Sequence, residues 1–271
     1  MAVYRWYGWF LHCYFNSRKV IKFLQVMSMN FYLLKRISYE LRVAKVNFFK
    51  ISILLLSKIS YGSKTIKKSV ELPSEGNSEI GKLLVDGQFI FSGVKFDLDV
   101  HSPWAIKPPS FEVEQSLHGF CWLNDLAACG NSRARVLAAD WISEWHNKNL
   151  IVKNLVLDPD LAALRCLNLL KNWQFLNGSS NKEVEINSKW LWQQYNYLRL
   201  MFIFFPIGFK KIQLGYVVFL LAMSFDIRIR TKKKILKRLC KVVQIVVGPD
   251  RQVPTRCPED FFKYFIILID L

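Results

Sequence analysis

Hydrophobic residues recur at three- and four-residue steps along most of the chain, a spacing typical of amphipathic α-helices. The pattern predicts helices at residues 111–128, 132–147, 158–173, 182–204, 208–225, 228–247 and 258–271. Short turns separate these helices, and neighbours joined in this way pack as antiparallel hairpins. The fold class is therefore mainly α, and the periodicity leaves a helical bundle, a solenoid and a closed toroid open.

Local signals support several of the helix ends. Asp158 can cap a helix and Pro159 suits its first turn, so a helix is predicted to start there. Gly130 is predicted to end the helix before it, and the segment 248–250, Gly-Pro-Asp, is predicted to end the one at 228–247.

The region between residues 71 and 110 has a different pattern. Residues 71–81 are rich in Pro, Ser, Gly and Asn, which predicts a linker. Residues 88–99 alternate apolar and polar side chains around Gly93, which predicts a strand pair or one bent strand, a short β segment near 87–99. The prolines within residues 102–110 exclude a regular helix there.

These patterns divide the chain into three parts. Residues 1–70 are predicted to form a basic amphipathic helical arm, residues 71–110 a linker with short strands and a Pro-rich segment, and residues 111–271 a helical domain. The arm could lie on a membrane surface through its basic and aromatic residues, or pack on the body as a helical extension.

Charge indicates an anionic partner or surface. The formal net charge is +17, and Glu40 is the only acidic residue among the first 68. A second basic run follows at Arg228, Arg230, Lys232, Lys233, Lys234, Lys237, Arg238 and Lys241. Such a run is either a solvated helix face or a binding patch. Nucleic acid is the weaker expectation, because no nucleic-acid-binding motif accompanies the charge.

Composition indicates a globular core and limits the kinds of site and the cellular locations that the sequence predicts. Hydrophobic residues make up 52% of the chain, enough for a sizeable core. The six cysteines are scattered without a CxxC pair, so neither a metal site nor a cofactor is predicted. The N-terminus has no clear signal peptide, which favours a cytoplasmic or peripheral membrane location over secretion. The longest apolar run, residues 214–225, is shorter than the roughly 20 residues that span a bilayer and predicts a buried helix.

Three stretches resemble the heparinase II/III family of polysaccharide lyases, in the form common among alphaproteobacteria. The first is Phe-Ile-Phe-Ser-Gly at 89–93, leading into Ser-Pro-Trp-Ala-Ile-Lys-Pro-Pro-Ser at 102–110. The second is Leu-His-Gly-Phe-Cys-Trp-Leu-Asn-Asp-Leu at 117–126, continued by residues 134–135 and 140–142. The third is Gly-Pro-Asp at 248–250, followed by Thr-Arg-Cys-Pro at 255–258.

The resemblance implies an N-terminal (α/α) toroid, followed in the family by a β-sandwich, with an anionic polysaccharide between them. The reaction is β-elimination at a uronic acid, which needs a group that neutralises the carboxylate, a base and an acid. This chain departs from the family after the helix at 228–247. The family's Pro-Asp-Gly-Gly-His becomes Pro-Asp-Arg-Gln-Val at 249–253, so Val253 stands where the family has a histidine that can titrate.

Residue types suggest a few site candidates. His118 and Tyr197 could act as acid or base, and Arg256, which matches the family, is a third catalytic candidate. Candidates for substrate binding are Trp122, Tyr195, Asn196 and Arg256. His118 and Trp122 are four residues apart, which predicts one helix face that lines a sugar cleft or makes a core contact. For Tyr197 a structural role is favoured over a catalytic one.

The sequence therefore predicts an incomplete (α/α) toroid of antiparallel helical hairpins at residues 111–271. The functional expectation is a heparinase II/III-like lyase, truncated before the sandwich and inactive as this chain, with an anionic polysaccharide as the partner. The alternative is a non-catalytic module that binds an acidic glycan, or an anionic membrane surface through residues 1–68.

Overall fold

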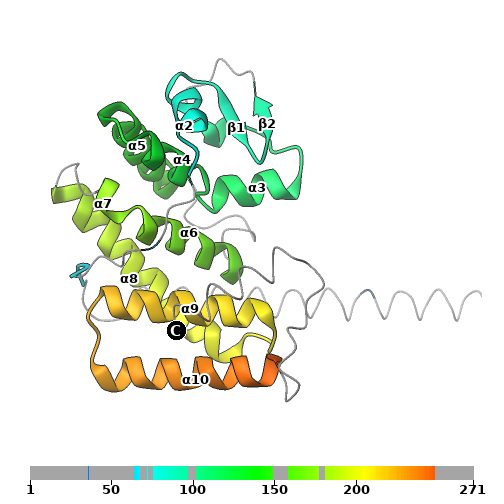
Figure 1. Cartoon of the computed structure of the whole chain (residues 1–271), viewed down its shortest axis with the longest axis vertical. Helices are drawn as coiled ribbons and strands as arrows, with labels where there is room; N and C mark the ends of the chain where they lie inside the picture. The colour runs from blue at the N-terminus through cyan, green and yellow to red at the C-terminus, as the bar shows by residue number, and fades with distance from the viewer. Residues whose placement is uncertain are drawn as a thin grey trace, which may run out of the picture. The chain divides into compact units, whose positions relative to one another are not determined.

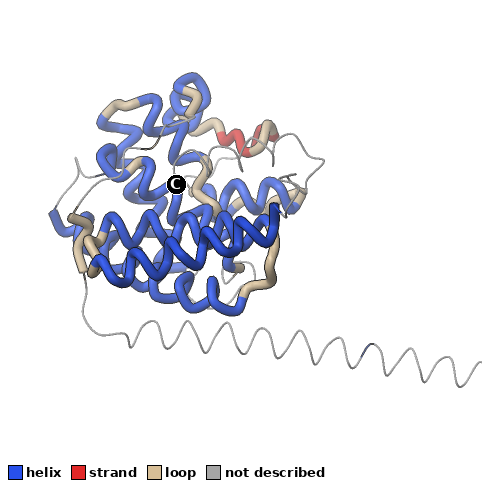
Figure 2. Tube along the Cα trace, turned by 60° about the horizontal axis from the view of Figure 1, so that its bottom comes forward, coloured by secondary structure: helices blue, strands red, loops and turns tan. Residues whose placement is uncertain are grey.

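The computed structural model describes residues 36, 64–67, 72, 76–96, 102–148, 158–176 and 181–247. The chain divides into two compact units, Met1–Lys50 and Ile51–Leu271, and every element described below belongs to the second. Within these ranges the protein is mainly helical with one short strand pair, which confirms the mainly α prediction (Figures 1 and 2).

The helices come in an order close to the predicted one. They are α2 (Ser78–Val85), α3 (Phe111–His118), α4 (Trp122–Cys129), α5 (Ser132–Lys148), α6 (Pro159–Lys171), α7 (Trp173–Leu176), α8 (Asn181–Phe204), α9 (Phe209–Ser224) and α10 (Ile229–Val247). The ends of α5, α8, α9 and α10 lie within one residue of those predicted. The predicted helix at 258–271 and the segment at 248–250 lie outside the described residues.

Helix α2 corrects the prediction of a linker at residues 71–81. Asn77 starts this helix, because its side chain accepts hydrogen bonds from the backbone N–H groups of Glu79 and Ile80. Gly81 then allows a very close approach to α4, since a Cβ at this position would overlap the carbonyl oxygen of Asp125. The polar composition that suggests a linker is thus the composition of a capped helix start that packs on α4.

Residues 89–96 form a strand pair, which settles the choice between a pair and a bent strand. Strands β1 (Phe89–Phe91) and β2 (Val94–Phe96) are antiparallel, and Phe91 lies opposite Val94. Ser92 and Gly93 both have positive φ, 49° and 75°, as a tight two-residue hairpin turn requires. The buried rings of Phe89 and Phe91 join the hydrophobic core.

The Pro-rich segment after the hairpin contains only a short 3-10 turn, η1 (Pro103–Ala105), as its prolines predict. Ser102 caps this turn and donates a hydrogen bond to Glu144 of α5 at 2.6 Å. The indole N–H of Trp104 donates to the carbonyl oxygen of Trp141 at 2.9 Å. The segment is therefore held against α5.

The predicted single helix at residues 111–128 is wrong, because the structure breaks it into α3 and α4. Gly119 and Phe120 form the break, and Phe120 has a φ of 60° with its ring fully buried. Helix α6 supplies the reason. Arg165 donates to the carbonyl oxygen of His118, and Asn168 donates to that of Gly119, both at 2.9 Å. Side chains from α6 thus bind carbonyls that the end of α3 leaves without helical partners.

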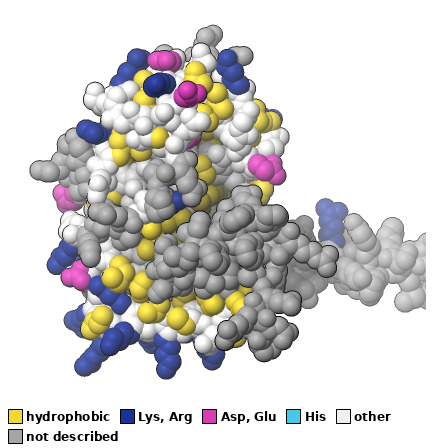
Figure 3. Space-filling model, viewed as in Figure 1, with side chains coloured by type: hydrophobic (Ala, Val, Ile, Leu, Met, Phe, Trp, Pro, Cys, Tyr) yellow, Lys and Arg dark blue, Asp and Glu magenta, His cyan; other side chains and the backbone are white. Residues whose placement is uncertain are grey.

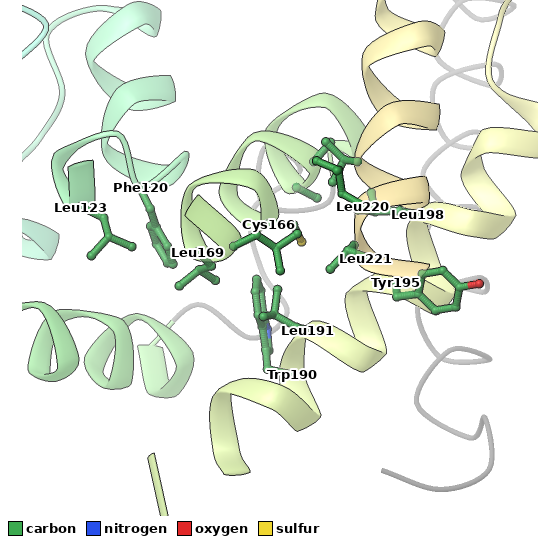
Figure 4. Close-up of a cluster of buried hydrophobic side chains, with 14 of the residues drawn as sticks. Phe120, Leu123, Cys166, Leu169, Trp190, Leu191, Tyr195, Leu198, Leu220 and Leu221 are labelled. Atoms are coloured by element: carbon green, nitrogen blue, oxygen red, sulfur yellow. The ribbon is translucent and has the colours of Figure 1, made fainter. Parts of the chain in front are cut away.

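Helix α6 starts as predicted, with Asp158 as the cap and Pro159 in the first turn. Helix α9 packs against α6, α8 and α10. Gly215 of α9 lies so close to Phe202 of α8 and Leu239 of α10 that a Cβ would crowd both side chains. Figure 4 shows the buried apolar side chains between these helices, with Cys166 of α6 between Leu169 and Leu221.

Candidate functional site

The candidate residues within the described ranges are all buried. Their exposed fractions are 5% for His118, 1% for Trp122, 2% for Tyr195, 4% for Asn196 and 1% for Tyr197. Arg256 lies outside the described residues. A side chain this closed to solvent cannot reach a polysaccharide without a rearrangement of the surrounding core.

The structure separates His118 and Trp122, which the sequence predicts on one helix face. His118 is the last residue of α3, and Trp122 is the first residue of α4. The indole N–H of Trp122 donates to the carbonyl oxygen of Leu117 at 3.1 Å, across the break between the helices. Trp122 also packs edge-on against Trp141, with ring centroids 5.1 Å apart. Its surroundings are those of a core tryptophan.

His118 instead belongs to a cluster around Arg165, here called the Arg165 cluster. Nδ1 of His118 accepts a hydrogen bond from the indole N–H of Trp145 at 3.1 Å, and its ring stacks on that of Trp104. The guanidinium of Arg165 lies 4.3 Å from the centre of the Trp145 ring and 6.0 Å from that of Trp190. Residues of α3, α5, α6 and α8 thus enclose one buried cation.

Burial sets the electrostatics of this cluster. Desolvation lowers the pKa of Arg165 to about 10 and raises the pKa of the neighbouring Cys166 thiol to about 12. Burial also raises the pKa of Tyr197, with a smaller opposing effect from Arg165. A phenol whose pKa is raised is a poor base near neutral pH, so this environment favours a structural role for Tyr197.

The structure places Tyr195 away from this cluster, and Asn196 makes a hydrogen bond within its own helix. Tyr195 stacks on Trp192, with centroids 5.3 Å apart, and its hydroxyl points away from Phe120 and Trp190 (Figure 4). Asn196 donates to the carbonyl oxygen of Trp192 one turn earlier in α8. The five described candidates therefore do not form one site.

Sequence reasoning missed Arg165 and Asn168, the two side chains of α6 that organise this region. A signal was present, because both interrupt the apolar segment that runs from Leu161 to Leu170. A charged or amide side chain in such a segment is buried only with hydrogen-bond partners. The partners themselves lie about 50 residues earlier in the chain and have no local signal.

His146, beside the cluster, gives a pH-dependent prediction. Burial, and to a lesser extent Arg165, lowers its pKa to about 4, and its Nε2 has no hydrogen-bond partner among the described residues. The unfolded chain binds this proton near pH 6.5, so stability present above that pH is lost as the pH falls toward 4. From about pH 7 to about pH 5 we expect the free energy of unfolding to fall by about 1–2 kcal/mol through this group.

His146→Phe should remove this part of the pH dependence. Urea unfolding of both proteins at each pH measures it, since the difference between their slopes isolates His146 from other titrating groups. Equal slopes would show that the ring is solvated in the folded protein.

A second candidate site is the exposed face of α10. Ile235, Leu239 and Val242 bury one side of this helix, and the helix contains no acidic residue. Figure 3 shows Lys and Arg side chains gathered along the lower edge of the view, where Figure 1 places α10. The exposed basic residues of the helix, here called the basic face, are Arg230, Lys233, Lys234, Lys237, Arg238 and Lys241.

Other kinds of site find no support in the described part of the chain. Its His, Cys, Asp and Glu side chains form no group of three or more that could hold a metal ion. None of its helices has the length and apolar character needed to cross a membrane.

Comparison of the sequence and structure with protein-family models, curated proteins and solved structures finds no match.

Proposed function

We propose that this chain is a heparinase II/III-like protein whose helical body is an (α/α) toroid, and that it does not cleave polysaccharides. The observation that carries the second part is the burial of both titratable candidates. His118 and Tyr197 are packed in the core, so neither can exchange a proton with a uronate chain bound at the surface. Val253, where the family has histidine, adds to this argument.

The arrangement of the resembling stretches supports the family proposal. The ring centroid of Phe89, in the first stretch, is 5.6 Å from that of Trp141, in the second. The ring of Trp104 is 5.7 Å from that of His118 in the second stretch. These residues are far apart in the chain but form one aromatic core, so their pattern is a coherent structural signature. The toroid itself is inferred from the resemblance and from the succession of helices α8, α9 and α10 through short turns.

Incubation with heparin-like, hyaluronate-like and alginate-like polysaccharides tests this proposal through the ultraviolet absorbance of the unsaturated product. We expect no turnover above background, because loss of one general acid or base alone costs about 10²–10⁴ in rate. Turnover that disappears in His118→Ala or Tyr197→Phe would refute the proposal and identify the active group.

A second candidate function is a non-catalytic module that binds an acidic glycan or a membrane surface. The basic face of α10 favours it, because six exposed cations on one helix attract a polyanion. Titration of the chain with the same polysaccharides, by calorimetry in low salt, separates binding from cleavage. Absence of any binding would leave no support for a glycan partner.

A further inference from the structure

The basic face of α10 forms a continuous stripe. Arg230, Lys234, Lys237 and Lys241 follow one another at three- or four-residue steps, which places them on one side of the helix. Between Arg199 and Val247 the chain has 11 basic residues and one acid, Asp226, which forms an ion pair with Lys232 at 3.0 Å. The stripe therefore lacks neutralising partners within this part of the chain, and its like charges repel one another because they lie one turn apart.

The stripe ends in exposed apolar side chains. Ile245 continues it one turn after Lys241 and is 51% exposed. The turn between α8 and α9 adds Phe204 and Ile207, which are 61% and 58% exposed. Helices α9 and α10 run antiparallel, and the loop joining them is at the opposite end of the pair, so the start of α9 lies beside the end of α10 (Figure 1).

Large exposed apolar residues concentrate on this side of the described protein. Four of the nine lie close to the turn between α8 and α9 or at the end of α10: Ile203, Phe204, Ile207 and Ile245. A hydrated polyanion, either glycan or nucleic acid, gains nothing from exposed Ile207 and Ile245, although a base or a sugar ring can stack on an aromatic such as Phe204. A bilayer surface gains from both features, since anionic headgroups attract the cations and the acyl boundary accepts the apolar side chains.

We propose that α10, together with the turn between α8 and α9, docks the protein on a membrane surface that contains anionic lipid. The cations of the stripe lie over the headgroups, and Phe204, Ile207 and Ile245 insert at one end. This proposal extends the binding alternative above by naming its partner. It holds or fails independently of lyase turnover, because its assay contains no polysaccharide.

Flotation of the full chain with vesicles of phosphatidylcholine, with and without phosphatidylserine, tests the proposal. We expect binding only to the anionic vesicles. Lys234→Gln/Lys237→Gln/Lys241→Gln should weaken it on the order of 100-fold, given the contribution of each cation near such a surface. The matched control is Lys82→Gln/Lys107→Gln/Arg133→Gln, which removes the same charge from exposed positions on other helices and loops. It should change binding only a few-fold.

The apolar part is tested in the same way. Phe204→Ser/Ile207→Ser/Ile245→Ser should weaken binding by about 10-fold or more, since each removes buried apolar area at the interface. Its control, Phe111→Ser/Val136→Ser/Ile186→Ser, changes residues that are also exposed and should bind like the unaltered protein. Circular dichroism verifies that each variant is folded.

Three results would overturn the proposal. If Lys234→Gln/Lys237→Gln/Lys241→Gln and its charge control weaken binding equally, the net charge of the protein alone is responsible for binding. If Phe204→Ser/Ile207→Ser/Ile245→Ser binds normally while Lys234→Gln/Lys237→Gln/Lys241→Gln does not, the cations alone hold the protein on the vesicle and the apolar side chains do not insert. If every variant binds like the unaltered protein, another part of the chain, such as the basic residues 1–68, holds it on the membrane.

Discussion

Replacing Arg165 with alanine should lower the free energy of unfolding by about 3 kcal/mol. Three effects give this value. Loss of a large buried side chain costs about 2–5 kcal/mol in packing, and the carbonyl of His118, left without this donor, adds about 1–3 kcal/mol. In the opposite direction, removing a cation whose pKa burial lowers from 12.5 to about 10 relieves about 3 kcal/mol.

Arg165→Met is the matched control for this prediction. Methionine keeps most of the volume beside Trp145 and removes the charge, so packing is retained, and the relief of desolvation offsets the hydrogen bond that the carbonyl of His118 loses. We expect its free energy of unfolding to stay within about 1 kcal/mol of the unaltered protein. Urea unfolding followed by tryptophan fluorescence measures both variants. An alanine variant as stable as the unaltered protein would show that the guanidinium does not lie in the core.

Asn168→Leu should also destabilise the protein, by about 2–4 kcal/mol. The Asn168 side chain donates to the carbonyl of Gly119 and accepts from the amide of Asn124 at 3.2 Å. Leucine has a similar size and favours helix, but it leaves both partners without these bonds in the interior, at about 1–3 kcal/mol each. The same unfolding measurement gives the result.

Asn147→Leu is the control, because Asn147 is exposed on α5. It should change the free energy of unfolding by no more than about 0.5 kcal/mol. If Asn168→Leu costs no more than this control, then the turn between α3 and α4 forms without help from α6.

Local signals explain which parts of the fold could be predicted from the sequence. The start of α6 depends on Asp158 and Pro159, and both ends of α9 depend on the turns beside them, so these boundaries are found within one residue. The break between α3 and α4 has no such signal. It depends on hydrogen bonds from Arg165 and Asn168, which only the tertiary fold brings to the turn.

The candidate site could also be predicted only in part from the sequence. The types of residue in the chain identify His118 and Tyr197 as groups that can carry a proton. Whether they do so depends on burial, which the packing of α3, α5, α6 and α8 decides. The basic run at α10 is visible in the sequence, whereas its association with Phe204 and Ile207 depends on the antiparallel packing of α9 and α10.

The exchange rate of the Trp145 indole N–H, measured by NMR, tests most directly whether the Arg165 cluster is core or catalytic site. Trp145 is 3% exposed and donates this hydrogen to His118. Its signal, assigned through Trp145→Phe, should exchange slowly with solvent and stay unmoved when a heparin-like polysaccharide is added to saturation. Rapid exchange, or a shift on addition of the polysaccharide, would show that the cluster opens to substrate and would contradict a non-catalytic core.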